Sequence, residues 1–481
     1  MPRRVGLVAV GALVLGALSW STARGEPLPP EPPEAEGLSV YTAVLGDAEV
    51  GSLVELGIDR RDLQASPVSG AEDQLAVELI LSAAQVDVLA AQGVTLTPKD
   101  AGGRRIAAQA DGVFRRYSGP GGLQEELIAQ AAAYPTIAQL QVVGQTVNGQ
   151  DITGVRVTRN PTRARLGTRP TTVYVGAQHA REWITPEMVR RLLDHVLTGY
   201  GSDARITNLV NSNELWFIPV ANPDGYDFSH DVERLWRKNL RDNNGDGVIT
   251  PGDGVDLNRN YPTRWGYDNE GSSPNPGSET YRGPAPASEP ETQALDALFG
   301  QITPEFLVNY HSAAELLLYG LGWQVATPSP DDVIYEAMAG DDANPAVPGY
   351  DPDISAELYT TNGDTDSHMQ EAHKTLGFTP EMSTCEAASN SVEGDPWEAE
   401  DCGSGFEFPD DEALIQAEFE KNIPFALAVA ESAYDPDDPV SVVGRDTPYF
   451  VVDSFDVSYG DPQQVAVTAK RLVRGLIMQY R

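Results

Sequence analysis

The chain has 481 residues, which is enough for more than one domain of ordinary size. Its composition is strongly acidic, with 33 Lys and Arg against 71 Asp and Glu and a formal net charge of −38. This charge argues against nucleic acid or an anionic membrane as partner and favours a well-hydrated extracellular protein.

The N-terminus has the pattern of an export signal. Arg3 and Arg4 precede an apolar run over residues 5–18, and small residues at 21–23 offer a cleavage site. The run is too short to span a bilayer, and no cysteine near the cleavage site indicates a lipid anchor. We therefore expect a signal peptide over 1–25, a secreted protein and no membrane anchor, with general and twin-arginine export both open.

Residues 26–111 are predicted to form a Pro- and Glu-rich leader and then a small α+β module. Its predicted strands are 40–45, 74–81 and 94–97, and its predicted helices are 47–58 and 82–92. The basic pairs Arg104–Arg105 and Arg115–Arg116 follow. A compact module joined by a basic hinge to a larger domain is typical of a propeptide. A permanent accessory domain is the alternative.

The main domain is predicted over residues 112–434 and belongs to the α/β class. Its predicted strands are 137–147, 152–158, 171–175, 214–220, 305–309 and 378–382. Helices are predicted at 123–134, after the strand at 171–175, and at 411–432, where Pro424 should kink the helix or split it. We expect a mixed, largely parallel central sheet flanked by helices.

Residues 435–481 are predicted to be a linker and a short β-rich tail. The tail is too small to bury a core of its own. It either packs on the main domain or is the opening of a β-domain that the chain does not complete.

The two cysteines, Cys385 and Cys402, are close together late in the chain. In an exported protein, such an even pair is read first as a disulfide. We expect a structural disulfide rather than metal ligands, because the pair lacks partners at metal-binding spacing.

A predicted strand-to-helix turn carries the first candidate metal ligands. His179 and Glu182 are three residues apart there, so that both side chains can point into one cavity. His311 follows an apolar strand, at the end where α/β sheets build their sites. A single His-x-x-Glu pattern is usually accidental, but two imidazoles and a carboxylate are a set that leaves zinc one position for water.

Further polar side chains add the chemistry of a hydrolase. Glu381 also follows an apolar strand, and a carboxylate beside a zinc-bound water can move its proton to a leaving amine. Arg237 and Arg259 stand in two polar clusters, and arginine grips carboxylates and stabilises oxyanions. The alternatives are an exposed glutamate and solvated or ion-paired arginines.

These motifs occur in the order found in the carboxypeptidase A/B-type zinc metallocarboxypeptidases. The chain resembles this family from about residue 114 to 434, and most of all its secreted bacterial members similar to carboxypeptidase T. The matching segments are 179–182, 222–226, 234–237, 256–260, 311–312 and 359–381. The resemblance implies that His179, Glu182 and His311 bind one zinc ion per chain. It also implies that Glu381 is the general base and that Arg237 stabilises the oxyanion.

The resemblance further implies how a substrate is held. Asn258 and Arg259 match the pair that grips a free C-terminal carboxylate, and Tyr359 matches the tyrosine that closes over the substrate. Asp256 matches the carboxylate that orients the first zinc histidine. The implied partners are the C-termini of peptides or proteins, and we expect a monomer.

The loop over Tyr359–Asp366 is expected to line the pocket for the departing residue. Asp364 follows Gly363 there and is our candidate for pairing with a C-terminal Lys or Arg, while large apolar residues also enter. The alternative is that the aspartates of this loop only shape its turn.

Residues 242–253 match the pattern of a calcium-binding loop. Asp242, Asn244, Asp246 and Asp253 supply oxygens at positions 1, 3, 5 and 12, and glycine stands at position 6. Aspartate at position 12 weakens bidentate coordination compared with glutamate. An acidic loop without an ion is the alternative.

Taken together, the sequence predicts a secreted zinc metallocarboxypeptidase made as a proenzyme. The alternative is a catalytically inactive carboxypeptidase-like module that binds partners with the help of calcium. The presence of Glu381 together with all three zinc ligands favours the enzyme.

Overall fold

The computed structural model describes residues 37–46, 49–51, 53, 56–58, 63–68, 70–99, 112–325, 329, 331–358, 360–452 and 467–469. The predicted signal peptide, the basic pair Arg104–Arg105 and Tyr359 lie outside these residues. Within the described part, no helix combines the length and apolar character that a bilayer crossing requires.

The described part of the N-terminal module is an antiparallel sheet with one helix. The strands lie in the order β2-β3-β1-β4, and the elements are β1 (Ser39–Gly46), β2 (Gln64–Val68), β3 (Ala71–Leu81), α2 (Ala83–Ala91) and β4 (Thr97–Pro98). Helix α2 begins after Ser82, whose side chain forms a capping box with Gln85. Leu45, Leu79 and Leu89 belong to the module's own core. Of the helix predicted at 47–58, residues 49–51 and 53 are helical and 56–58 are not, whereas residues 47, 48, 52, 54 and 55 lie outside the described residues.

A mixed nine-stranded sheet forms the centre of the described main domain. Its order is β14-β11-β15-β9-β7-β8-β6-β5, and β10 pairs with β15. Strands β8, β7, β9 and β15 run parallel, whereas β6 and β11 pair antiparallel with this central group. The strands are β5 (Ala138–Gln145), β6 (Asp151–Val157), β7 (Thr171–Val175), β8 (Glu214–Ile218), β9 (Phe306–Asn309), β10 (His311–Ser312), β11 (Leu316–Tyr319), β14 (Asp351–Ile354) and β15 (Leu376–Met382). The predicted mixed α/β sheet is confirmed.

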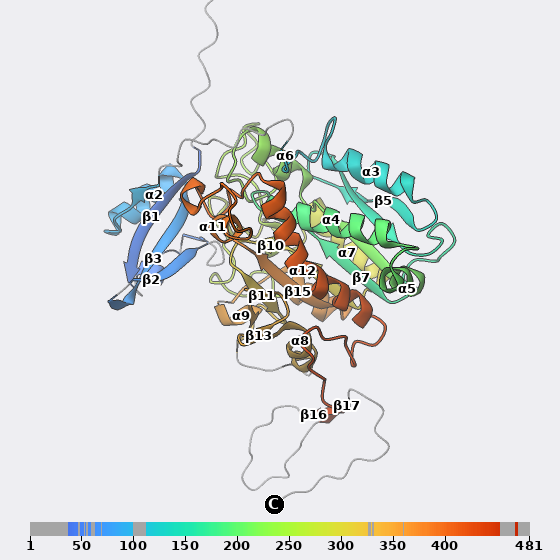
Figure 1. Ribbon diagram of the computed structural model, residues 1–481. Helices are drawn as coiled ribbons and strands as arrows, with labels where there is room; N and C mark the ends of the chain where they lie inside the picture. The colour runs from blue at the N-terminus through green and yellow to red at the C-terminus, as the bar shows by residue number, and fades with distance from the viewer. Residues whose placement is uncertain are drawn as a thin grey trace, which may run out of the picture. The chain divides into compact units, whose positions relative to one another are not determined.

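Helices cover both faces of this sheet (Figure 1). Strand β7 is buried on both faces: Tyr174 lies in the core cluster that includes α4 and α12, and Val173 and Val175 lie in the cluster that includes α7. The longer helices are α3 (Leu123–Ala133), α4 (Ile184–Gly199), α5 (Ala204–Ser212), α6 (Pro223–Asp231), α7 (Pro290–Ile302), α8 (Asp332–Ala339) and α12 (Glu412–Ser432). The shorter elements are η2 (Leu257–Arg259), β12 (Gly340–Asp341), β13 (Asn344–Pro345), α9 (Ser355–Leu358), α10 (Thr365–His368), η3 (Met369–His373), α11 (Cys385–Ser389) and η4 (Ala399–Asp401).

Helix α12 is continuous although Pro424 lies inside it, so of the two outcomes expected at this proline, a kink or a split, the split does not occur. Proline removes one backbone hydrogen bond and costs roughly 3 kcal/mol in a helix interior. The helix buries Leu414, Phe419 and Phe425 and contacts α4, β7 and β9. Each buried apolar side chain contributes about 1.5–3 kcal/mol, which is enough to offset the proline.

The predicted disulfide is present and joins Cys385 to Cys402, 17 positions apart. Beyond α12, the chain stays attached to the main domain: Ser441 Oγ donates to Ala337 O at 2.5 Å, and Arg445 pairs with Asp341. The last described elements are the paired strands β16 (Phe450–Val452) and β17 (Val467–Ala469). Whether they belong to a further domain stays a prediction.

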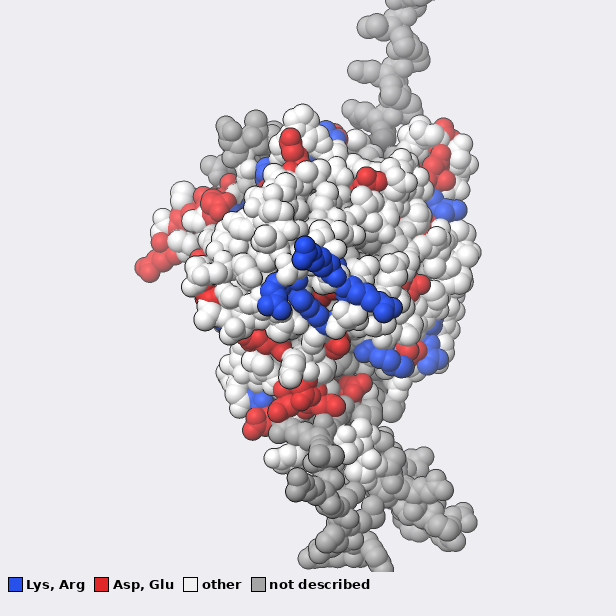
Figure 2. Space-filling model, turned by 90° about the vertical axis from the view of Figure 1, so that its right-hand side faces the viewer, with Lys and Arg blue, Asp and Glu red and all other residues white. Residues whose placement is uncertain are grey.

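Charge is distributed unevenly over the surface. The net charge is −38, yet Lys and Arg side chains gather at the centre of the face that Figure 2 shows, with acidic side chains mostly around them. The acidic composition therefore does not make every face of the protein negative.

Candidate active site

The turn between β7 and α4 delivers the first two candidate metal ligands. His179 and Glu182 lie in this turn, and both are almost fully buried. The turn starts at Gly176, where a Cβ atom would stand 2.8 Å from Pro219 O and 2.9 Å from Thr185 O. Only glycine fits this close approach of three backbone segments, so the tight turn depends on it.

His311 reaches the same point from the other side. It follows β9 and forms the short strand β10, beside β15. Its Nδ1 lies 3.1 Å from Glu182 Oε2 and 3.1 Å from His179 Nδ1, and His179 Nδ1 lies 2.7 Å from Glu182 Oε1. The three side chains form one of the described groups whose ligand atoms lie within 4.8 Å of one another.

This donor set fits a zinc ion. Two imidazoles and a carboxylate are the ligands of many catalytic zinc sites. Glu182 Oε2 is buried beside His311 Nδ1, so the carboxylate and the imidazole face one point that a bound cation can share. Burial raises the pKa of the Glu182 carboxyl, but His179 and His311 lower it to about 2, so the carboxylate is ionised.

Neighbouring polar side chains orient the two histidines. His179 Nε2 lies 3.1 Å from Asp256 Oδ1, which leaves Nδ1 for a metal. His311 Nε2 lies 3.0 Å from the Asn309 amide, whose Oδ1 has no partner among the described residues. The Asn309 side chain thus holds the His311 ring on the side opposite Nδ1, the atom that faces Glu182.

Asp256 links the metal ligands to the arginine that sequence analysis singled out. Arg237 Nη2 and Nε donate to Asp256 Oδ2 at 3.1 and 3.3 Å, and Asn258 N donates to Oδ1 at 2.8 Å. Burial raises the pKa of Asp256, but the charges of Arg237 and His179 outweigh it and hold that pKa well below its usual range. Burial and Arg237 lower the pKa of His179, whereas Glu182 and Asp256 raise it, and its net pKa is raised.

Glu381 is placed by strand register. It lies in β15, where it is the Cα partner of His311 in the parallel pairing of β10 with β15, and its exposed fraction is 2%. The sheet therefore brings the candidate base and a candidate ligand to the same level of neighbouring strands. This follows the expectation that the carboxyl ends of parallel strands carry the site.

Asn258 and Arg259 lie in η2, close to Asp256 in sequence and space. Asn258 Oδ1 accepts from Thr365 N at 2.9 Å and from Thr365 Oγ1 at 2.8 Å, and Arg259 Nη1 donates to Asn258 O at 2.7 Å. The exposed fraction of Arg259 is 0% in this form of the protein. Tyr359, the third predicted substrate contact, is not among the described residues.

Asp364 forms the N-cap of α10. Its Oδ1 accepts from Ser367 N at 2.9 Å, and its Oδ2 accepts from Thr361 Oγ1 at 3.0 Å. Both carboxylate oxygens are thus used in shaping the loop. Specificity for a basic residue stays a prediction for this side chain.

The aspartate oxygens of the predicted calcium loop accept hydrogen bonds from the loop's own backbone amides. Asp242 accepts from Gly245 N and Gly247 N, and Asp253 is buried and accepts from Asn243 N and Thr250 N. Two described groups of His, Asp and Glu side chains have ligand atoms close enough for a metal, and neither includes Asp242, Asp246 or Asp253. Asn244 Nδ2 donates to Asp246 Oδ2 at 3.0 Å. Calcium binding finds no support here.

Gln178, Asn309 and Thr365 are contacts that the sequence analysis missed. Gln178 Nε2 donates to Thr365 Oγ1 at 2.8 Å, and Asn309 Nδ2 donates to Gln178 Oε1 at 3.1 Å. These amides and the hydroxyl connect the His311 side of the site to Asn258. Gln178 precedes His179, and Asn309 is two residues before His311 on the same strand face, so their positions were a usable signal.

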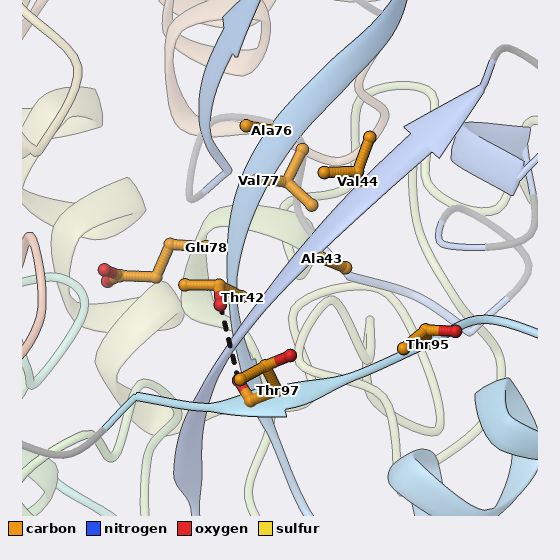
Figure 3. A pocket seen from close by; sticks show the side chains of 8 residues that line it. All are labelled: Thr42, Ala43, Val44, Ala76, Val77, Glu78, Thr95 and Thr97. Atoms are coloured by element: carbon orange, nitrogen blue, oxygen red, sulfur yellow. Dashed lines mark hydrogen bonds between the residues drawn. The ribbon is translucent and has the colours of Figure 1, made fainter. Parts of the chain in front are cut away.

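A pocket of about 540 Å³ lies elsewhere, on the N-terminal sheet. Its lining residues are Thr42, Ala43, Val44, Ala76, Val77, Glu78, Thr95 and Thr97. Figure 3 shows the Glu78 carboxylate pointing away from Val44 and Val77. That carboxylate pairs with Lys99 at 2.6 Å and accepts from Ser404 Oγ at 2.9 Å, so it is fully engaged in holding the structure together.

A buried cluster of two histidines and one glutamate at the carboxyl edge of an α/β sheet defines a metal-dependent class of protein. The family model described as zinc carboxypeptidase matches residues 123–417, which is more than half of the chain, and the chain belongs to this family.

Individual relatives agree with the family. The metallocarboxypeptidase A-like protein of Trichophyton verrucosum (strain HKI 0517) is 33% identical over 243 residues, which cover 49% of this chain and 54% of that protein. Metallocarboxypeptidase A of Trichophyton tonsurans is 33% identical over 224 residues, which cover 44% and 52%. The chain thus spans about half the length of the curated relatives that it matches.

Two solved structures share the fold. The thrombin-activatable fibrinolysis inhibitor has a TM-score of 0.60 at 18% identity, covering 83% of this chain and 99% of that chain. Carboxypeptidase A of Helicoverpa armigera has a TM-score of 0.59 at 21% identity, covering 83% and 98%. At these identities, the likeness concerns the fold alone.

Proposed function

We propose that the protein is a secreted zinc-dependent metallocarboxypeptidase that removes single residues from the C-termini of peptides or proteins. The observation that carries this proposal is the convergence of His179, Glu182 and His311, joined through Asp256 to Asn258. The zinc carboxypeptidase family match over 123–417 supports it. A monomer stays a prediction.

The proposed roles follow from the contacts described above. Zinc held by the three ligands would lower the pKa of a bound water and polarise the scissile carbonyl. Glu381 takes a proton at its carboxylate from the attacking water and passes it to the leaving amine. Arg237, held at 3.1 Å by Asp256, donates to the oxygen on which negative charge develops.

Recognition of a free carboxylate makes the proposed enzyme an exopeptidase. Arg259 offers two parallel N–H groups to the substrate's terminal carboxylate, and the Asn258 amide adds a donor. The contacts of Thr365 support this assignment. Thr365 donates to Oδ1 of Asn258, so the Nδ2 group of Asn258 is the one that can donate to the substrate. Tyr359 is proposed to close over the bound residue.

We further propose that the N-terminal module is a propeptide. Gly57 O accepts from Ser278 Oγ at 2.9 Å and from Thr280 Oγ1 at 3.3 Å. The same loop supports the site, because Asp256 N donates to Tyr281 O at 2.8 Å. A module bonded to the loop that positions Asp256 is suited to keep the site closed until it is released.

The test is release of a C-terminal residue by the trypsin-treated protein. Blocked dipeptides ending in Phe, Leu, Lys or Arg serve as substrates, with and without a chelator. We expect cleavage that the chelator abolishes and added Zn²⁺ restores. The same peptides with an amidated C-terminus are the matched control and should resist, because Arg259 then lacks its carboxylate. No cleavage by the zinc-loaded, trypsin-treated protein would support an inactive binding module instead.

A further inference from the structure

A second cluster of metal-ligating side chains lies outside the candidate active site. It consists of Asp296 on α7, His368 at the end of α10 and His373 at the end of η3. The ligand atoms of these three side chains lie within 4.8 Å of one another. The proposed peptide hydrolysis uses none of them.

The carboxylate–imidazole distances in this second cluster can be compared with those in the candidate active site. Asp296 Oδ1 lies 2.9 Å from His368 Nε2 and 2.6 Å from His373 Nε2. The corresponding carboxylate–imidazole distances at Glu182 are 2.7 and 3.1 Å. Ligands about 2 Å from a tetrahedral zinc are separated by about 3.3 Å, so the carboxylate–imidazole pairs of both clusters need to open by about 0.2 to 0.7 Å. The two clusters therefore have the same donor set at nearly the same spacing.

A π-helix brings the two histidines to one side of their segment. His368 and His373 are five residues apart, and in an α-helix they would point about 140° away from each other. The segment Met369–His373 is instead a π-helix with His368 as its N-cap, and its wider turn brings the two rings to a centroid distance of 5.6 Å. Single π-turns occur frequently at functional sites.

The burial of the cluster suits a bound ion with an open position. The side chains of His368 and His373 are 6% and 16% exposed, whereas Asp296 is 35% exposed. The imidazoles are thus held by the protein, and the carboxylate side is open to solvent. An ion can enter from that side and keep a water ligand.

A hydrogen bond on the far side of one ring is compatible with a metal-binding tautomer. His368 Nδ1 lies 2.8 Å from Thr263 Oγ1. When Nδ1–H donates to this hydroxyl, the lone pair of Nε2 points at Asp296 Oδ1 and is available to a cation between the two atoms; when the hydroxyl donates instead, Nε2–H donates to Asp296. An outer hydrogen bond of this kind is the usual partner of a metal-ligating histidine.

We propose that Asp296, His368 and His373 bind a second divalent transition-metal ion, with Zn²⁺ as the ion of choice for two imidazoles and a carboxylate. The ion ties α7 to the α10–η3 segment. The chemical alternative is a metal-free ion pair in which protonated histidines donate to Asp296.

The second ion has a consequence for the substrate clamp, and this consequence rests on the proposed function. The segment that carries His368 begins with Thr365, which holds the Asn258 side chain. The His368 ring also stacks on Tyr261 at a centroid distance of 5.3 Å, close to η2. An ion at the second cluster would therefore brace the wall that positions Asn258 and Arg259, and its loss would raise KM more than it lowers kcat.

The first measurement is metal content. The full chain is equilibrated with free Zn²⁺ buffered at about 1 µM, and bound zinc is counted by mass spectrometry of the metal. We expect two zinc ions per wild-type chain and one in His373→Gln and in Asp296→Asn. A His179→Ala/His311→Ala variant should keep the second ion. Adding Zn²⁺ should raise the Tm of that variant, because an ion that binds only the folded state stabilises it.

Controls make each outcome decisive. His195→Gln on α4 removes a histidine that belongs to neither cluster and should leave two ions bound. One ion in wild type and one in His373→Gln overturns the proposal and leaves an aspartate–imidazolium ion pair. Two ions in wild type and two in His373→Gln overturn it as well, since the second ion then binds elsewhere. If His373→Gln loses one ion while its circular dichroism spectrum matches that of the wild type, the proposal is supported. This result does not depend on whether the variant of the buried active-site histidines folds.

Discussion

Asp256 connects the two halves of the candidate active site through its two carboxylate oxygens. Oδ1 faces His179 and the backbone amide of Asn258, and Oδ2 accepts from Arg237. Because the pKa of Asp256 is held well below its usual range, the carboxylate stays charged at pH values at which an ordinary aspartate takes up a proton. One buried charge thus fixes a candidate metal ligand, the proposed oxyanion donor and the start of the proposed substrate clamp.

Replacing Glu381 by Gln tests the general base. The substitution keeps the shape of the side chain in β15 but removes the group that accepts a proton. We expect kcat to fall by at least about 10²–10⁴-fold while bound zinc and the Tm stay the same. Near-normal turnover by a zinc-loaded Glu381→Gln protein would remove this residue from the mechanism.

Asp364→Asn tests substrate specificity. Asparagine keeps an oxygen acceptor for Ser367 N, so the helix cap is retained, but it loses the charge that we propose pairs with a C-terminal Arg. We expect the ratio of kcat/KM for Arg over Leu substrates to fall about tenfold, which is about 1.4 kcal/mol. Asp366→Asn is the matched control from the same loop. If the ratio falls only in Asp366→Asn, the charge is read by Asp366 and Asp364 serves only as a cap.

At the scale of elements, the parts that sequence analysis anticipated are those that face the core. The β-branched residues at 171–175 predict a buried strand, and a histidine and a glutamate follow it. This combination is a specific signal, because few sites other than metal sites place these residue types after a buried strand. Strand β2 escaped prediction because residues 65–67 are exposed at a sheet edge and include a proline. Thr365 escaped because its partner Asn258 is 107 positions away, and a hydroxyl has no distinctive spacing of its own.

The N-terminus of α7 carries a carboxyl group that should make stability depend on pH. Burial, together with Glu289, raises the pKa of Glu291 from 4.5 to about 7. Between these values, the unfolded chain loses its proton first, so stability falls as pH rises from about 4.5 and the loss is complete above about 7. The full effect is roughly 3 kcal/mol.

Glu291→Gln should remove this dependence, because the amide keeps an oxygen for Val147 N but does not ionise. Urea unfolding of both proteins at pH 5 and pH 8 measures it. We expect the variant to gain stability over wild type at pH 8 by more than it does at pH 5. An equal difference at both pH values would mean that Glu291 titrates normally in the folded protein.

At the scale of the whole molecule, the N-terminal module is held to the main domain by a mixed interface. Leu38 and Ile80 join the core cluster of the main domain, and Leu38 N donates to Glu233 Oε2 at 2.9 Å. Glu78 bonds to Ser404 and Gly405. A few apolar contacts with several hydrogen bonds are typical of an interface that can be released.

Activation should follow from a cut in the hinge. Arg115 and Arg116 are held in ion pairs with Glu126 and Asp231, so we expect the activating cut at Arg104–Arg105. Limited trypsin treatment should raise kcat/KM by on the order of 100-fold, which corresponds to about 2.7 kcal/mol of docking free energy.

The matched variants separate the two basic pairs. Arg104→Gln/Arg105→Gln should block activation by trypsin, whereas Arg115→Gln/Arg116→Gln should leave it intact, since only the first pair is expected to be cut. Mass spectrometry of the trypsin-treated chains locates the cut, and the activity of the same samples shows its effect. Equal kcat/KM for the uncut and cut chains would mean that the module leaves the site open and is an accessory domain. Arg259 has an exposed fraction of 0%, so a substrate carboxylate reaches its guanidinium only after a segment of the chain moves, and a rise in activity after the cut would identify the module as that segment.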